Sequence, residues 1–172
     1  MNYFELFAQP LQFELDTTQL AEHYRRLQQQ FHPDRYAAAA DAERLVALQQ
    51  AAEINSGYQT LKDPLTRAEY LLSLLGLDIR GEQHTLQDPE FLMQQLAWRE
   101  ELEALRESAD PDAAIPLFAQ RIHREYQRLL TILTQALAVP EREVAATQIR
   151  KLKFIRKLRE ELERLEDSLM DL

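Results

Sequence analysis

The 172-residue chain contains no cysteine and only three glycines. The lack of cysteine excludes disulfides, thiolate metal ligands and a thiol nucleophile. Leu, Ala, Glu, Gln and Arg dominate the sequence instead, and these side chains lose little conformational freedom in a helix. The composition therefore predicts an all-α protein.

Long apolar runs are also absent. No stretch approaches the ~18 apolar residues that span a bilayer, and the opening MNYFELFAQP has neither the basic flank nor the apolar core of a signal peptide. We therefore expect a cytoplasmic protein with no membrane partner. The formal net charge of −9 argues against nucleic acid as the main partner, because such binding depends on neutralising phosphates.

The first helical block is predicted to be a hairpin. A capping pattern at Asp16 starts a helix that runs to about Phe31 and has one buried face. That face carries Leu20, Tyr24, Leu27 and Phe31 at spacings of four, three and four. Pro33 disfavours helical geometry at His32, so residues His32 to Asp34 should form an exposed loop.

A second long helix is expected from about Asp41 to Lys62. Its apolar residues fall on two sides, with Leu45, Leu48 and Ala52 on one and Ala51, Ile54, Tyr58 and Leu61 on the other. Two apolar sides predict contacts with more than one neighbouring helix. Asp63-Pro64 then starts a short helix through Leu75.

The polar stretch GLDIRGEQHTLQD holds two of the three glycines and marks a domain boundary. We expect a first domain at 1–75, a linker at 76–87 and a second domain at 88–172. Asp88-Pro89 opens a helix to about Glu107, Asp110-Pro111 ends it, and further helices follow at about 113–138 and after Pro140. The second domain is therefore predicted to be an antiparallel three-helix bundle.

The segment QFHPDRY places a His-Pro-Asp tripeptide at the bend of the hairpin. An enzymatic site with His32 as base and Asp34 as its orienting carboxylate lacks a nearby nucleophile. A metal site lacks further ligands, because no two histidines are paired at helical spacing. A purely structural turn, in which Pro33 fixes φ and Asp34 caps, leaves the exposed His32 unexplained.

The first 75 residues resemble a J-domain. The resemblance rests on NYFELF, LAEHYRRLQQQFHPDRY and AAEINSGYQTLKDPLTRAEYLL, in that order. It implies no catalytic residue in this chain; instead the loop binds a DnaK-type chaperone ATPase and stimulates its ATP hydrolysis. The chaperone-binding residues that it implies are His32, Pro33, Asp34, Arg25, Arg26 and Gln29. Glu22 shares the outward face of the helix and makes its basic character thin.

The helix after Asp88 has two different faces. Phe91, Trp98, Leu102 and Leu105 fall on one side, which should pack on the other two helices of the bundle. The nearly opposite side carries Leu92, Met93 and Leu96, followed by Glu100, Glu103 and Glu107. An apolar patch that runs into carboxylates favours an interaction site, with packing on the first domain as the alternative.

The apolar seam of the final helix is predicted to run through Ala145, Ile149, Leu152, Ile155, Leu158, Leu162, Leu165 and Leu169. Phe154 lies about 100° off this seam. It is either a core residue at a helix crossing or an anchor that joins the Leu92 patch. The basic run from Arg150 to Arg159 is followed at once by acidic residues, which favours a solvated bundle face over a nucleic-acid site.

The whole chain resembles the HscB family, J-type co-chaperones of iron–sulfur cluster assembly. The second-domain resemblance rests on EQHTLQDPEFLMQQLAWREELEAL and IRKLKFIRKLREELERLE. It implies that this domain binds the scaffold IscU and presents it to the ATPase HscA, with no cofactor or metal of its own. The scaffold-binding residues are expected to be Leu92, Met93, Leu96, Glu100, Glu103 and Phe154.

Two positions depart from the family pattern, because Ala97 and Ala104 stand where relatives can have carboxylates. These departures predict scaffold binding that is weaker or differently oriented. The alternative function is a J-domain adaptor for another client protein. The mitochondrial relatives carry a cysteine-bearing N-terminal extension, and its absence here favours a bacterial source.

Overall fold

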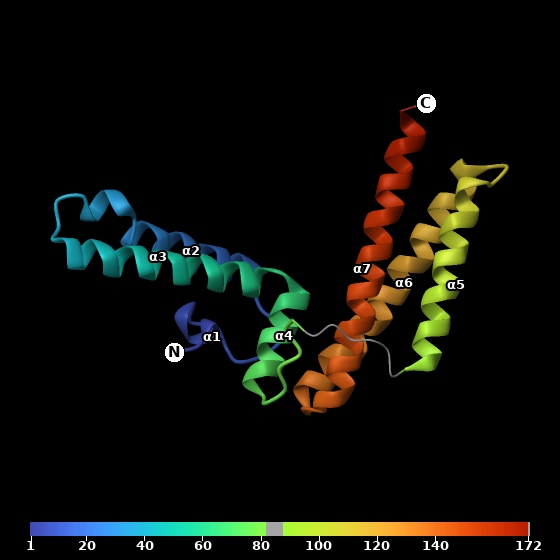
Figure 1. The fold of residues 1–172 in the computed structure, drawn as a ribbon. Coiled ribbons are helices and arrows are strands. Elements are labelled where there is room, and N and C mark those ends of the chain that lie inside the picture. Colours follow the sequence, from blue (N-terminus) through green and yellow to red (C-terminus); the bar gives the residue numbers. More distant parts are fainter. Residues whose placement is uncertain (82–87, 172) are drawn as a thin grey trace. The chain divides into compact units, whose positions relative to one another are not determined.

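The computed structural model describes residues 1–81 and 88–171, and these are helical without any strand. The elements are α1 (Tyr3–Leu6), α2 (Thr17–Gln30), the 3-10 helix η1 (Pro33–Tyr36), α3 (Asp41–Lys62), α4 (Pro64–Leu74), α5 (Pro89–Arg106), α6 (Pro111–Ala138) and α7 (Arg142–Met170) (Figure 1). The all-α prediction is confirmed. The chain forms two compact units, Met1–Asp78 and Ile79–Leu172. Their boundary falls within the segment predicted as a linker, of which residues 82–87 lie outside the described residues.

Unit 1 is built around the α2–α3 hairpin, whose helices run antiparallel and are joined through η1 (Figure 1). The helices α1 and α4 both pack against α3. The fully buried side chains of this core include Phe4, Phe7, Leu20, Ile54 and Leu61. Gly57 lies where α1 approaches α3, because a Cβ atom there would meet rings of Phe7 and Tyr3 at 2.9 Å.

Arg67 fixes α4 to the rest of unit 1. Its buried guanidinium donates hydrogen bonds to the carbonyl oxygens of Leu61 (2.8 Å) and Phe13 (2.9 Å). Burial lowers the pKa of Arg67, and the carboxylate of Asp63 opposes this effect. Arginine remains charged at any physiological pH, so unit 1 holds a permanent buried cation that is satisfied by backbone acceptors.

Aspartate caps start four of the helices. The side chain of Asp16 accepts hydrogen bonds from the backbone N–H groups of Thr18 and Gln19 at the start of α2. Asp63, Asp88 and Asp110 each cap a helix whose first residue is proline.

The prediction that Asp110-Pro111 ends the preceding helix is therefore wrong. The helix α5 already ends at Arg106, and Asp110 accepts a hydrogen bond from the N–H of Ala113 to start α6. An Asp-Pro pair suits a helix start, since proline at the first helical position lacks only an N–H that no helical acceptor would use. A glycine marks the C-terminal end of α4. Gly76 follows this helix and adopts a left-handed conformation with φ of 105°.

Unit 2 is a bundle in which α6 and α7 pack along each other and α5 packs on both (Figure 1). Its most deeply buried side chains include Ile122, Leu129, Leu133, Ile149, Leu152, Leu158 and Leu162. On α5, Leu102 and Leu105 are buried, and Trp98 contacts Phe118 of α6 edge-on at 5.6 Å between ring centroids. The predicted core face of α5 and seam of α7 are thus confirmed.

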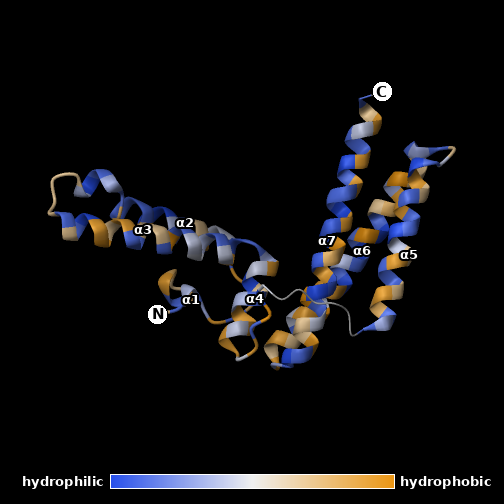
Figure 2. Cartoon of the chain, viewed as in Figure 1, coloured by the Kyte–Doolittle hydropathy of each residue, from blue (hydrophilic) through white to orange (hydrophobic). Residues whose placement is uncertain are grey.

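The prediction that α3 contacts more than one neighbouring helix is confirmed, since α1, α2 and α4 all pack on it. The side that carries Leu45 and Leu48, however, is not a packing side. Leu45 and Leu48 are each 56% exposed, and Val46 beside them is also exposed. Apolar residues colour this end of α3 in Figure 2. The elements α1, α2, η1 and α4 all pack on α3, but they leave Leu45 and Leu48 exposed.

Candidate functional site

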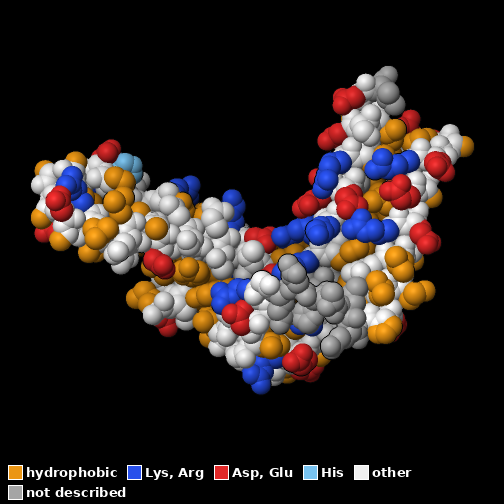
Figure 3. Space-filling view, in the orientation of Figure 1, with side chains coloured by type: hydrophobic (Ala, Val, Ile, Leu, Met, Phe, Trp, Pro, Cys, Tyr) orange, Lys and Arg blue, Asp and Glu red, His pale blue; other side chains and the backbone are white. Residues whose placement is uncertain are grey.

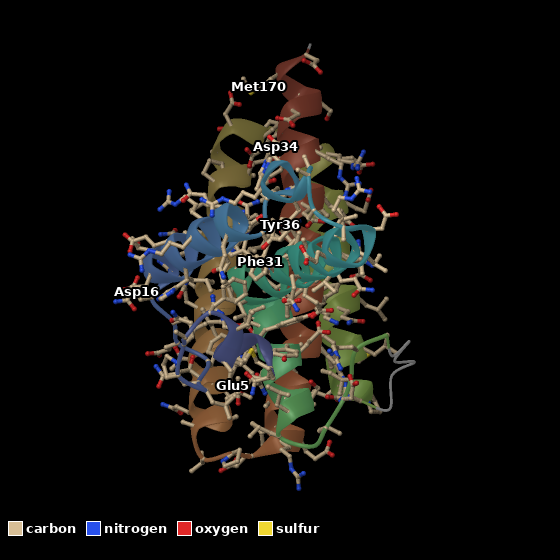
Figure 4. The ribbon with its side chains drawn as sticks, turned by 90° about the vertical axis from the view of Figure 1, so that its left-hand side faces the viewer. Glu5, Asp16, Phe31, Asp34, Tyr36 and Met170 are labelled. Carbon is tan, nitrogen blue, oxygen red and sulfur yellow. The ribbon has the colours of Figure 1, made fainter. Side chains whose placement is uncertain are left out.

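The His-Pro-Asp turn is exposed and held by local hydrogen bonds. The helix α2 ends at Phe31, and His32 then adopts an extended conformation with φ of −64° and ψ of 136°. The Nδ1 atom of His32 accepts a hydrogen bond from the backbone N–H of Asp34 at 3.2 Å, and the backbone N–H of Arg35 donates to the carbonyl oxygen of His32 at 3.0 Å. Figure 4 looks onto this end of the hairpin and shows Asp34 at the turn.

This geometry corrects one sequence-based interpretation, because the capping side chain of the turn is His32 and not Asp34. Since Nδ1 accepts a hydrogen bond, a neutral imidazole carries its proton on Nε2. The side chains of His32 and Asp34 are 58% and 92% exposed. The turn therefore offers a partner a ring donor, an exposed carboxylate that lies 3.6 Å from His32 Nδ1, and the rigid ring of Pro33.

The adjoining face of α2 is polar and exposed. Arg25, Arg26 and Gln29 all point to solvent, as the helical periodicity predicts, and Glu22 shares the surface. Figure 3 shows basic side chains along α2. A positive surface next to the turn can steer an acidic partner toward it.

A polar contact that the sequence did not reveal ties α2 to α3. The hydroxyl of Tyr24 donates to Oδ1 of Asn55 at 2.6 Å and accepts from Nε2 of Gln28 at 2.8 Å. The Tyr24 ring also packs edge-on against Tyr58, with 4.0 Å between centroids. Tyr24 was predicted only as a core residue, since periodicity identifies a buried face but not the acceptor opposite a hydroxyl.

An apolar groove lies at the turn end of the hairpin. Its volume is about 330 Å³, and it is lined by Phe31, Tyr36, Ala42, Glu43, Val46 and Ala47. Figure 4 shows that Phe31 and Tyr36 lie near Asp34 at this end of unit 1. Its residues come from three separate elements, so sequence periodicity alone could not indicate the groove.

In unit 2, α5 presents the predicted apolar patch. Leu92, Met93 and Leu96 are 38%, 66% and 50% exposed. Glu100 and Glu103 continue along the same helix and are also exposed, with Glu103 close to Arg106 at 3.7 Å. The prediction that these apolar side chains point away from the bundle core is confirmed.

Phe154 is a nearly buried residue at the contact between α5 and α7, which agrees with the first of the two alternatives that its off-seam position left open. Only 9% of Phe154 is accessible. Phe91 contacts its ring edge-on at 5.9 Å, and the guanidinium of Arg99 lies over the ring at 5.5 Å from the centroid. Its off-seam position on α7 therefore places the ring in contact with α5.

The described residues hold no cluster of three or more His, Cys, Asp or Glu side chains suited to a metal ion. None of the helices in 1–81 and 88–171 is both long enough and apolar enough to cross a bilayer.

Comparison with known proteins agrees with this anatomy. Residues 87–163 match the family model described as the HSCB C-terminal oligomerisation domain. The chain is 60% identical over 171 residues to the co-chaperone protein HscB homolog of Aeromonas hydrophila and 55% identical over 170 residues to that of Vibrio cholerae, with 99% of each chain covered in both cases.

Solved structures show the same relationship. The chaperone HscB from Vibrio cholerae superposes with a TM-score of 0.94 at 55% identity and covers 98% of this chain and 99% of its own. The human co-chaperone protein HscB shares the fold, with a TM-score of 0.86 at 24% identity, covering 96% of this chain and 82% of its own. Relatives this similar over nearly the full length establish the family: the chain belongs to the HscB co-chaperones.

Proposed function

We propose that the chain is a two-armed, non-enzymatic adaptor in the bacterial cytoplasm. Unit 1, which we call the chaperone arm, binds an HscA-type chaperone ATPase and stimulates its ATP hydrolysis. Unit 2, which we call the scaffold arm, binds an IscU-type iron–sulfur scaffold. The observation that carries the proposal is the presence of two exposed recognition surfaces of different chemistry, one on each compact unit.

The chaperone arm uses the turn and the adjoining face of α2. His32, Pro33 and Asp34 form a stiff, exposed epitope that loses little conformational entropy on binding. A contact of this kind biases the conformation of the chaperone and needs no chemistry from this chain. Arg25 and Arg26 steer the encounter, and Gln29 extends the polar surface toward the turn.

The scaffold arm uses the patch on α5. Each of Leu92, Met93 and Leu96 contributes on the order of 1.5 to 3 kcal/mol when fully buried, before association costs. Exposed carboxylate pairs contribute ~0.2 to 1 kcal/mol each. The apolar trio therefore sets most of the affinity, and Glu100 and Glu103 mainly set the orientation of the scaffold.

The deciding experiment is single-turnover ATP hydrolysis by the HscA-type chaperone of the same genome, with and without its IscU-type scaffold. We expect this chain alone to stimulate hydrolysis and the scaffold to increase the stimulation further. If the scaffold does not change the stimulation and does not bind in a direct titration, unit 2 binds a different client protein. No stimulation under any condition would refute the chaperone arm.

A further inference from the structure

We propose that Arg99 and Glu161 form a polar latch over Phe154, and that the partner seated on the Leu92 patch opens this latch by offering Arg99 a carboxylate of its own. Arg99 is then a specificity-determining residue of the scaffold arm. The inference rests on the scaffold-binding role of unit 2 proposed above.

The latch is a cross-helix contact. Arg99 lies on α5, whereas Phe154 and Glu161 lie seven residues apart on α7 and therefore share a side of that helix. Nη1 of Arg99 is 2.5 Å from Oε2 of Glu161, while the guanidinium carbon lies 5.5 Å from the centroid of the Phe154 ring. The guanidinium thus pairs with an acid and covers an aromatic face at once.

Arg99 also borders the apolar patch. It follows Leu92 by seven residues, so the two side chains project within about 20° of each other on α5. A partner that covers Leu92 and Leu96 therefore reaches the Arg99 side chain next. Beneath that side chain lies the ring of Phe154, which is 9% accessible.

The charges around Phe154 indicate which partner chemistry fits. Lys151 lies over the ring of Phe91 at 5.7 Å, and Phe91 in turn contacts Phe154. Lys157, one turn beyond Phe154 on α7, is exposed. Figure 3 shows basic side chains gathered over α5 and α7 with acids between them. The surface suits a protein segment that carries a carboxylate beside an apolar side chain.

The ion pair is well suited to exchange. The side chains of Arg99 and Glu161 are 43% and 31% exposed, and ion pairs of this exposure are weak and screened by salt. Replacing Glu161 by a partner carboxylate conserves the charge pairing of Arg99 and leaves Glu161 free to hydrate. The exchange uncovers the Phe154 ring for apolar contact.

The bundle contains a matched control. Arg121 of α6 pairs with Glu101 of α5 at 2.5 Å and lies over the ring of Trp98 at 5.0 Å. This second clamp also combines an arginine, a glutamate and an aromatic ring, but Glu101 lies on the side of α5 that faces α6. Substitutions there should disturb the bundle as much as substitutions in the latch, without touching the scaffold arm.

The test measures affinity of the full-length chain for the IscU-type scaffold by calorimetry at several salt concentrations. We expect Arg99→Gln to weaken binding by about two- to fivefold, the effect of losing one exposed ion pair, and to flatten the salt dependence. We expect Glu161→Gln to strengthen binding by up to about twofold, because it releases Arg99 to the partner. Arg121→Gln and Glu101→Gln should leave the affinity unchanged.

The sign of the Glu161 effect separates the latch from a merely structural pair. If Glu161→Gln weakens binding as much as Arg99→Gln, the pair only stabilises the bundle and the latch is refuted. If Arg99→Gln has no more effect than Arg121→Gln, Arg99 does not contact the partner. Leu96→Ala serves as the reference: unchanged binding of that variant overturns the proposed scaffold arm itself, whereas a loss with Leu96→Ala alone overturns only the latch.

Discussion

The ring nitrogen Nδ1 of His32 accepts the backbone N–H of Asp34 at 3.2 Å, so the histidine shapes the turn that it also displays. One side chain therefore combines a structural and a recognition role. Its outer nitrogen and the Asp34 carboxylate remain available to a partner, because neither side chain is enclosed by unit 1.

Replacing His32 by glutamine should abolish most of the stimulation of the chaperone ATPase. Loss of a hydrogen bond to a charged partner costs about 1.5 to 3 kcal/mol, which corresponds to roughly tenfold or more. Single-turnover hydrolysis measures this directly, with circular dichroism as the check on folding. Equal stimulation by both proteins would remove the turn from the mechanism.

The pair Arg25→Ala/Arg26→Ala should slow association with the chaperone at low salt and matter little at high salt. Steering by exposed charges acts over about one Debye length, which is ~10 Å at 0.1 M ionic strength. Stopped-flow association rates test this prediction. Arg124→Ala, an exposed change in unit 2, is the control for loss of positive charge, and an equal effect of that control would show that only net charge matters.

Leu92→Ala/Leu96→Ala should weaken scaffold binding by roughly a hundredfold. Each truncation removes on the order of 1.5 kcal/mol of apolar burial, or about tenfold. Titration of the scaffold provides the measurement. Leu117→Ala is a matched control, because Leu117 is an exposed leucine on α6 that lies outside the patch. Unchanged affinity in the double variant with intact folding would contradict the assigned surface.

Gly57→Ala should destabilise unit 1, although alanine is the better helix former by about 1 kcal/mol. The added Cβ would stand 2.9 Å from ring atoms of Phe7 and Tyr3, so α1 must move away from α3. Overpacking of this kind costs about 1 to 3 kcal/mol. Urea unfolding of this variant and of the exposed neighbour Ser56→Ala tests the prediction, and a gain in stability in both variants would contradict it.

The free energy of unfolding should depend slightly on pH through the carboxyl group of Glu125 on α6. Its side chain accepts hydrogen bonds from Arg128, which lowers the pKa of Glu125 below that of an unfolded chain. A lowered carboxyl pKa stabilises the fold above the unfolded pKa, and the contribution disappears as pH falls through the folded pKa. Since the pair is partly exposed, Glu125→Gln should cost less than about 1 kcal/mol at neutral pH. A cost that grows on acidification would contradict this.

Local signals in the sequence predicted the helices well. Aspartate caps, helix-starting prolines and three-four apolar spacing act within a few residues, so Asp16, Asp63 and Asp88 identified helix starts correctly. The error at Asp110 arose because an Asp-Pro pair also follows a helix end. Only the start of α6 shows which function the pair has there.

The site was less predictable, because its geometry depends on neighbours. Helical angles correctly placed Leu92, Met93 and Leu96 on the outside, but they could not show that α5 approaches Phe154 closely enough to cover it. The same limit applies to Leu45, whose apolar character predicted packing although its side chain is 56% exposed. Helical angles predict the direction in which a side chain points. Whether that side chain is buried depends also on how closely the next helix approaches, which the angles do not give.

The hydrogen bonds that shape the His-Pro-Asp turn close within a few residues: His32 Nδ1 with the N–H of Asp34, and the N–H of Arg35 with the carbonyl of His32. A turn that is stabilised by hydrogen bonds among its own residues can keep its conformation in another protein. Residues 30–36 transplanted into the bend of an unrelated antiparallel helical pair should keep their shape, which would allow a designed protein to borrow this epitope.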